Sequence, residues 1–372
     1  MMLLVKTLAR LVLLLTVAGL SWGQPRQADP LRLGIVGLTH GHVAGFFHRN
    51  LHRSDIQIVG IAEPDPQLRE KYARQFRIDK NLFFASLDEM LTQKHPQGVL
   101  VYTSTFDHRK IVEQCAASGI HVMMEKPLAV SYADARAMET AAKKGKIHVL
   151  VNYETTWYAS NKAAYDLAQQ GAIGAIWKMI AHDGHQGPKE IHVQPEFFSW
   201  LTDPKLNGAG ALYDFGCYGA DLMTWLMKGE APRTVTAVTK QIKPSIYPKV
   251  DDDADVILNY ANAVAILQPS WNWPFNIKDM VLYGKTGYAR TVQQDMLQVR
   301  RPQDKDVQNE KAAPLAPPYD DPIHYFRAVI DGRVPDERSL SSLDTNIIVS
   351  EILDAARRSA RSGTAVTLPL RD

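Results

Sequence analysis

The sequence has little cysteine: Cys115 and Cys217 are the only two among its 372 residues. A disulfide-dense scaffold needs several cysteine pairs, and a cysteine-ligated zinc site needs closely spaced ligands, so both classes are excluded. The two residues lie far apart, and we expect them to fall in different domains. We therefore predict two free thiols, even in a chain exported to an oxidising compartment.

The sequence also lacks an excess of charge of either sign. It has 42 Lys and Arg against 40 Asp and Glu, which gives a formal net charge of +2. A nucleic-acid-binding surface is normally basic, and we expect no nucleic-acid partner. A polyanionic substrate is not favoured either, because no basic excess is available to bind it.

Long hydrophobic runs are missing except near the N-terminus. The run Leu11–Leu20 follows Lys6 and Arg10 and precedes small residues, which is the order of a secretory signal. It is short for a membrane-spanning helix, which needs about 20 apolar residues. We expect residues 1–23 to be a cleaved signal peptide, and the mature chain to be periplasmic or secreted without stable membrane insertion. A retained anchor is the open alternative.

The remaining sequence is globular in composition, with 45% hydrophobic and 22% charged residues, and its length suits two domains. Between residues 30 and 152, short Val- and Ile-rich runs alternate with helical patterns. This alternation predicts a doubly wound parallel sheet, that is, an α/β Rossmann domain that binds a dinucleotide. The expected strands cover residues 32–38, 56–63, 98–104, 121–125 and 147–153.

Helix boundaries are marked within this first domain. Ser131 and Asp134 have the spacing of a capping box, which predicts a helix beginning there. Gly119 and Gly145 follow helical patterns, and we expect both to cap helix C-termini in the left-handed conformation.

The pattern changes after residue 153. Residues 153–372 are expected to form an α+β catalytic and substrate domain with a large, mostly antiparallel open sheet. A final helix at 343–363 could pack back on the Rossmann domain. Residues 301–322 are polar and rich in proline, and we expect a long surface loop there. The expected strands cover residues 175–184, 233–242, 253–261, 263–271, 276–284 and 288–292.

The first expected strand ends in a degraded dinucleotide turn. A G-x-G-x-x-G turn lets backbone amides approach a pyrophosphate at a helix N-terminus. Here Gly37 is present, Thr39 and His42 replace the second and third glycines, and Gly41 comes one place early. We expect these residues and His40 to bind the cofactor, although a tight strand-to-helix turn without a ligand fits the pattern equally well.

Glu63 strengthens the cofactor prediction. It ends the second expected strand, where a carboxylate can hydrogen-bond adenosine ribose hydroxyls and repel a 2′-phosphate, so NAD is favoured over NADP. Ligands of such sheets bind beyond the carboxyl ends of the strands. For that reason Thr103, His108, Glu125 and Lys126 are also cofactor-binding candidates.

Two stretches resemble the signatures of one enzyme family. HVMMEKPLA, which contains Lys126, is similar to a signature of the glucose-fructose oxidoreductase and inositol dehydrogenase family, Gfo/Idh/MocA. Residues 208–221 resemble its second signature, D-x-G-x-H-x-x-D. Asp214 and Asp221 match that pattern, and Tyr218 replaces the histidine, as in the tyrosine-bearing branch that includes glucose-fructose oxidoreductase.

The resemblance implies catalytic roles for three residues. Lys126 would hydrogen-bond the reacting hydroxyl and stabilise developing negative charge. Tyr218 would be the acid/base, with its phenolate favoured by a nearby ammonium. Asp214 would orient the hydroxyl or the lysine, and either Lys126 or Tyr218 could take the proton. Members of the family often pair through the open face of the C-terminal sheet, which implies a homo-oligomer.

Further residues are weaker candidates for contacts with a carbohydrate substrate. We expect His182, His185 and Glu154 to form a polar wall of the pocket, although with His192 they could also be read as metal ligands. Tyr153 and Trp157 are aromatic candidates for the same pocket. No metal is expected.

Three functions remain open. The resemblance implies first an NAD-dependent oxidoreductase that acts on CH–OH groups of sugars, glycosides or polyols. The second is a redox-neutral glycoside hydrolase or lyase with tightly bound NAD, and the third is a binding protein without activity. Free NAD should be scarce outside the cytoplasm, which favours a retained cofactor in either enzyme.

Overall fold

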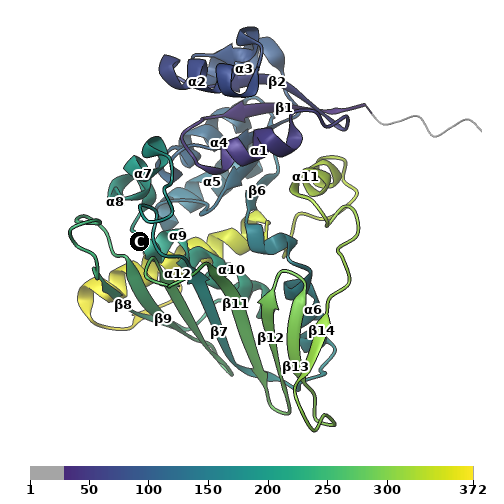
Figure 1. The fold of residues 1–372 in the computed structure, drawn as a ribbon, viewed down its shortest axis with the longest axis vertical. Helices are drawn as coiled ribbons and strands as arrows, with labels where there is room; N and C mark the ends of the chain where they lie inside the picture. The colour runs from purple at the N-terminus through teal and green to yellow at the C-terminus, as the bar shows by residue number, and fades with distance from the viewer. Residues whose placement is uncertain (1–28, 372) are drawn as a thin grey trace, which may run out of the picture.

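The computed structural model describes residues 29–371. It contains two sheets, and Figure 1 shows the smaller one above the larger. The predicted signal peptide, residues 1–23, lies outside the described residues. Within the described part of the chain, no helix combines the length and the hydropathy needed to cross a membrane.

The first sheet is parallel, with the strand order β3-β2-β1-β4-β5-β6. This confirms the predicted doubly wound sheet. The order reverses between β1 and β4, and ligands of such sheets bind in the crevice at that point. The strands are β1 (Leu31–Val36), β2 (Ile56–Ala62), β3 (Phe83–Phe84), β4 (Gly98–Val101), β5 (His121–Glu125) and β6 (Val149–Asn152).

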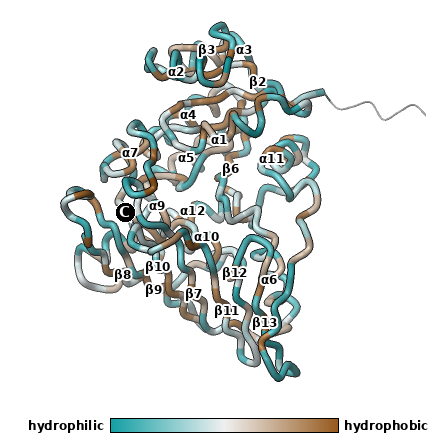
Figure 2. The backbone as a smooth tube through the Cα atoms, in the orientation of Figure 1, coloured by the Kyte–Doolittle hydropathy of each residue, from teal (hydrophilic) through white to brown (hydrophobic). Residues whose placement is uncertain are grey.

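Both faces of the first sheet are covered, which explains why most residues of its strands are hydrophobic (Figure 2). On one face, Met123 and Leu150 join a core with α1 and α11, and on the other Val122 and Val149 join the larger core. The helices concerned are α1 (His42–Asn50), α2 (Pro66–Phe76), α3 (Leu87–Lys94), α4 (His108–Ala117), α5 (Tyr132–Gly145) and α11 (Pro322–Ile330).

The predicted helix boundaries hold with one exception. Ser131 Oγ accepts a hydrogen bond from the amide of Asp134 at 3.1 Å, and Gly119 follows α4 with a φ of 68°. The prediction that Gly145 is a left-handed cap is wrong, because Lys146 takes that position with a φ of 52°. A Cβ on Gly145 would lie 2.5 Å from a backbone oxygen of α4, so the glycine allows α4 and α5 to approach closely.

The second sheet has the order β14-β13-β12-β11-β7-β10-β9-β8-β15 and is antiparallel except for the pair β7 and β10. The predicted loop at 301–322 is partly wrong, because β14 lies within it and extends the sheet edge. The strands are β7 (Ile176–Gly184), β8 (Thr234–Lys240), β9 (Asp253–Asn259), β10 (Val264–Ser270), β11 (Ile277–Gly284), β12 (Tyr288–Gln293), β13 (Met296–Arg300), β14 (Gln308–Lys311) and β15 (Val366–Thr367).

In the described part of the chain, helices cover only one face of the second sheet. Helices α6 (Ala159–Gln169), α10 (Gly216–Leu226) and α12 (Leu343–Ser362) pack against it, and α12 also contacts α5 and β6 of the first sheet. The opposite face exposes apolar side chains, among them Val238, Ile257 and Tyr283. Three short helices follow β7 and lead to the site: α7 (Pro195–Leu201), α8 (Pro204–Asn207) and α9 (Ala211–Asp214).

Candidate active site

The structure brings Lys126 and Asp214 together from the two halves of the chain. Lys126 directly follows β5, and its Nζ lies 2.5 Å from Asp214 Oδ1 and 2.9 Å from the backbone oxygen of Asp214. Trp271 Nε1 donates to the other carboxylate oxygen at 2.9 Å. All three side chains are buried, so the pair is held by the packing of both domains.

The two charges stabilise each other. Burial by itself lowers the pKa of Lys126, but the Asp214 carboxylate offsets this effect, and the pKa lies above its ordinary value. Burial by itself raises the pKa of Asp214, but Lys126 holds it below its ordinary value. Both directions favour an ionised pair at neutral pH.

A carboxylate from a neighbouring loop fixes the short helix that carries Asp214. Asp251 accepts hydrogen bonds from the amides of Gly210 at 2.9 Å and Leu212 at 2.7 Å, at the start of α9. A Cβ on Gly210 would lie 1.8 Å from the backbone oxygen of Asp251. The glycine in the second signature therefore permits a close backbone approach that sets the position of Asp214.

Tyr218 lies on α10 between two ammonium groups. Its ring centroid is 5.2 Å from Lys126 Nζ and 4.9 Å from Lys278 Nζ. The expectation that an ammonium would favour the phenolate is wrong here, because burial raises the pKa of Tyr218 well above its ordinary value. Each lysine is also paired with a carboxylate, Lys126 with Asp214 and Lys278 with Glu154. Tyr218 is therefore a protonated phenol that can donate.

Sequence reasoning missed two residues beside Tyr218. Lys278 on β11 pairs in register with Asp183 on β7, so both side chains lie on the face covered by α10. Burial raises the pKa of Asp183 well above its ordinary value, and its Oδ1 has no hydrogen-bond partner among the described residues. Successive residues of a strand face opposite sides of a sheet, so the alternation along β7 could have indicated Asp183 in place of His182. No sequence signal distinguished Lys278 from other lysines.

The two histidines predicted for the substrate wall lie on different sides. Burial lowers the pKa of His185 to about 4, and its ring lies against Phe215, beside the Asp214 pair. His182 is one strand position before Asp183 and faces the opposite side of the sheet, where its Nδ1 lies 2.5 Å from Asp279 Oδ1. The prediction for His182 is therefore wrong, because alternate strand residues face opposite sides.

Of the other predicted substrate residues, one is buried in the core and two line a cavity. Tyr153 is fully buried and donates its hydroxyl to Asn346 at 2.8 Å, so its predicted substrate contact is wrong and its role is packing. Glu154 accepts from Tyr158 at 2.6 Å and pairs with Lys278. Trp157 donates to Asn152 at 3.0 Å beside a cavity at the edge of the first sheet.

This cavity has a volume of about 600 Å³, within the range of small-molecule sites. It lies between α1, α11 and the carboxyl ends of β4, β5 and β6. Four predicted site residues line it: His42, Glu125, Glu154 and Trp157. A second cavity, of about 840 Å³, lies between α12 and residues 239–251, and its lining includes Leu212 and Asp251 but none of the predicted site residues.

The dinucleotide turn requires glycine at its first position, Gly37, and the side chain of His40 is buried in the turn. Gly37 has a φ of 82°, and a Cβ there would lie 2.4 Å from Thr103 Cγ2. His40 is buried, and its Nδ1 accepts from the amide of His42 at 3.2 Å, so its Nε2 carries the proton. His42 in turn lies 3.0 Å from the buried carboxylate of Glu125.

Glu63 stabilises the dinucleotide turn through hydrogen bonds from backbone amides. One carboxylate oxygen accepts from the amide of Leu38 at 2.7 Å and the other from Asp65 at 2.9 Å, and burial raises the pKa of the group. The side chain is only 2% exposed. Its predicted role in selecting NAD over NADP stays a prediction.

The residues around the turn fit a dinucleotide. The first turn of α1 has no acidic side chain, so no carboxylate of this turn repels an anion. His108 begins α4, and its Nδ1 lies 3.2 Å from the backbone oxygen of Leu128. The Nε2 atoms of His40 and His108 are buried and have no partner within residues 29–371. Phosphate oxygens and ribose hydroxyls are groups that could satisfy them.

A metal could also be considered at this turn. Within the described residues, His40, His42 and Glu125 place one ligand atom each within 4.8 Å of the others. His40 Nδ1 already accepts a backbone hydrogen bond, however, and His42 already pairs with Glu125. The donor set is therefore satisfied within the protein, and we assign no metal to it.

The fold and site define a two-domain Rossmann oxidoreductase, in which the second domain brings Asp214 and Tyr218 to a lysine after β5. Comparison with protein families agrees. The model of an oxidoreductase family with an NAD-binding Rossmann fold, GFO/IDH/MocA, matches residues 31–153, and the model of the GFO/IDH/MocA C-terminal domain matches residues 161–290. The chain belongs to this family, whose cofactor is NAD, and the resemblance found in the sequence is confirmed.

Individual relatives are distant. Trans-1,2-dihydrobenzene-1,2-diol dehydrogenase from Macaca fuscata fuscata is 26% identical over 237 residues, which cover 63% of this chain and 66% of that protein, just under two thirds of its length. Many solved structures share the fold, among them the two that follow. Aldose-aldose oxidoreductase from Caulobacter crescentus has a TM-score of 0.77 at 22% identity, covering 91% of this chain and 100% of that one. An inositol dehydrogenase homolog complexed with NAD+ from Azotobacter vinelandii has a TM-score of 0.79 at 20% identity. The match covers 92% of this chain and 98% of that one.

Proposed function

We propose that this protein transfers hydride between NAD and a hydroxyl-bearing carbon of a sugar, glycoside or polyol. The observation that carries the proposal is the buried Lys126–Asp214 pair next to the Tyr218 ring, at the carboxyl end of β5. The relatives support the substrate class, because they include a dehydrogenase of a diol and an inositol dehydrogenase homolog.

The side chains supply charge and protons to this reaction. Bound NAD would accept or return the hydride at its nicotinamide ring. The Lys126 ammonium hydrogen-bonds the reacting oxygen and stabilises negative charge as it develops. Lys126 and Tyr218 both carry a proton at neutral pH, so the resting site is ready to protonate a carbonyl oxygen, which is the direction of reduction. Oxidation requires one of them to lose its proton first.

The test uses substrates labelled with deuterium at the oxidised carbon. Sugars, glycosides and polyols are screened for nicotinamide absorbance, and mass spectrometry then detects deuterium on the recovered cofactor. We expect label transfer in the native protein and a large loss in Lys126→Ala. Binding of NADH without label transfer from any hydroxyl compound would contradict the proposal.

A second candidate is a redox-neutral glycoside hydrolase or lyase with tightly bound NAD. It is supported by two acids near the lysine, Tyr218 and Asp183, because burial raises the pKa of both and cleavage of a glycosidic bond needs an acid for the leaving group. The two functions differ in products. Release of an aglycone without net formation of NADH would favour cleavage, and a ketone formed together with one NADH would favour the dehydrogenase.

We also propose export and self-association. Export is supported by the order of charged, apolar and small residues before Gln24. A homo-oligomer is supported by the open face of the second sheet, where Val238 is 56% and Ile257 43% exposed. Light scattering after size exclusion should give a mass above one chain, and Ile257→Lys should lower it.

A further inference from the structure

The cavity of about 840 Å³ between α12 and residues 239–251, here called the basic cavity, is bordered by basic side chains. In Figure 1 the C-terminal end of α12 lies beside β8, and the cavity lies between this helix end and the loop after β8. Lys240 borders the cavity, but alternation along β8 places its side chain on the open face of the sheet with Val238. Four other basic residues line the cavity from α8, the loop and α12: Lys205, Lys249, Arg357 and Arg361.

Most of these basic side chains have no acidic partner. Among the described residues, no carboxylate oxygen lies within 4.0 Å of the charged nitrogen atoms of Lys205, Lys249 or Arg361. The one acidic residue in the lining, Asp251, has both carboxylate oxygens occupied by backbone amides at the start of α9. Because the whole chain is close to neutral, this local excess of positive charge results from the fold and not from the composition.

Arg357 is fixed by hydrogen bonds at the wall of the basic cavity. Its Nη1 donates to the backbone oxygens of Gly208 at 3.0 Å and Val130 at 3.2 Å, and its Nη2 lies 2.8 Å from Asp354 Oδ1. Its Nε is buried and has no hydrogen-bond partner within the described residues. Buried donors normally have a partner, and an anion in the cavity could supply one. Arg361 follows one helical turn later, so both guanidinium groups project from the same face of α12.

We propose that the basic cavity binds a small organic anion that carries two or more phosphate or carboxylate groups. Arginine recognises the oxygens of both groups through paired N–H donors, and several cations around one cavity favour a ligand with more than one negative charge. The volume is within the range of small-molecule sites. None of the predicted site residues lines the cavity, so this ligand is not the substrate of the proposed hydride transfer.

The position of the basic cavity makes its ligand a regulator. One wall is formed by Gly208, Ala209 and Leu212, which lead into and begin α9, the helix that ends at Asp214. Arg357 donates to the backbone oxygen of Gly208 in the same wall. An anion bound to Arg357 therefore restrains the segment that positions Asp214 beside Lys126.

The test titrates inorganic pyrophosphate, and citrate as the carboxylate probe, into the purified full-length protein by calorimetry. Each titration is repeated with excess NAD+, because a pyrophosphate could also bind at the dinucleotide turn. We expect binding that NAD+ leaves unchanged. The dissociation constant should rise on the order of tenfold in the double variant Lys249→Gln with Arg361→Gln, which removes two charged donors.

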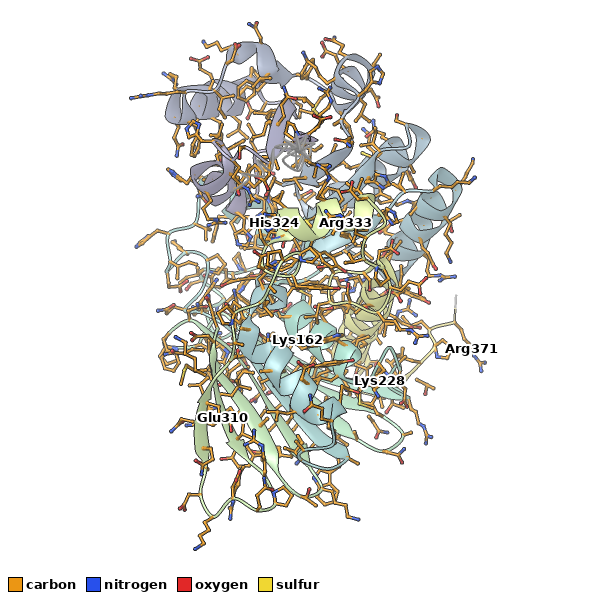
Figure 3. All side chains as sticks on the ribbon, turned by 90° about the vertical axis from the view of Figure 1, so that its right-hand side faces the viewer. Lys162, Lys228, Glu310, His324, Arg333 and Arg371 are labelled. Atoms are coloured by element: carbon orange, nitrogen blue, oxygen red, sulfur yellow. The ribbon has the colours of Figure 1, made fainter. Side chains whose placement is uncertain are left out.

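A matched control removes one lysine and one arginine elsewhere on the surface. Lys228 follows α10 and Arg333 follows α11, both are exposed and labelled in Figure 3, and neither lines the basic cavity. Lys228→Gln with Arg333→Gln should leave the affinity for pyrophosphate unchanged. Equal weakening in both double variants, binding that NAD+ abolishes, or no binding of either anion would overturn the inference.

Hydrogen–deuterium exchange tests the regulatory part without an activity assay. Peptides that contain residues 208–215 should exchange more slowly when pyrophosphate is bound to the native protein, and should not respond in Lys249→Gln with Arg361→Gln. Unchanged exchange in the native protein at saturating pyrophosphate would overturn the assignment of the ligand as a regulator. None of these readouts depends on hydride transfer, so failure of the proposed function would not mimic failure of this inference.

Discussion

Removing the ammonium of Lys126 should cost stability as well as activity. Lys126 and Asp214 are 6% and 5% exposed in their side chains. Among the described residues, Lys126→Ala therefore leaves a buried carboxylate with only the Trp271 N–H as a hydrogen-bond partner. Breaking one side of a buried pair typically costs about 3–5 kcal/mol. Turnover should also fall on the order of 100- to 1000-fold, because a donor to the transition state is lost.

The stability loss should depend on pH with a defined sign. In the native protein, the pKa of Asp214 lies below its unfolded value, so its stabilisation is complete at neutral pH and is lost only as the pH falls through that lowered pKa. Without Lys126, burial raises the pKa of Asp214 above the unfolded value. The carboxylate then destabilises the variant at neutral pH, and protonation relieves the penalty on acidification.

The assay is urea unfolding at about pH 7.5 and about pH 5. The gap in unfolding free energy between native protein and Lys126→Ala should be largest at the higher pH. The double variant Lys126→Met with Asp214→Asn should regain most of the loss, since neither charge remains. Lys162→Ala, which breaks an exposed pair, should change stability by less than about 1 kcal/mol. A loss of that small size for Lys126→Ala, or one that does not vary with pH, would refute the reasoning.

Four further outcomes are expected. Tyr218→Phe should slow the chemical step by roughly 100-fold with NADH affinity unchanged, and near-normal turnover would make the tyrosine structural. The oxidation rate should rise about tenfold per pH unit over the alkaline range, because the pKa of Tyr218 is raised; a flat profile would exclude it as the base. Apoprotein should bind NADH more tightly than NADPH in a fluorescence titration, as Glu63 predicts. N-terminal sequencing of native protein should begin near Gln24, and an intact Met1 on cytoplasmic protein would exclude export.

Local patterns predicted much of the first domain. Buried parallel strands carry apolar residues on both faces, so they form continuous apolar runs such as Gly98–Val101 in the sequence. Such runs differ visibly from the spaced apolar residues of amphipathic helices. The two-residue strand β3 is too short to give such a pattern. Gly145 looked like a helix cap, yet the reason for it is a contact with α4, and contacts between distant segments leave no periodic signal.

The sequence by itself determined the fold class and the family. It also indicated Lys126, Asp214 and Tyr218 as catalytic candidates, because all three lie in short contiguous signatures. Only the tertiary structure decided the protonation states and the neighbours of these three residues. Burial keeps Tyr218 protonated, and Lys278 and Asp183 join the site because β7 and β11 pair in register. The tertiary structure also brought Trp200 and Phe197 of α7 against the dinucleotide turn at Thr39 and His40. Burial, register and contact depend on which distant segments meet, and no local pattern encodes that.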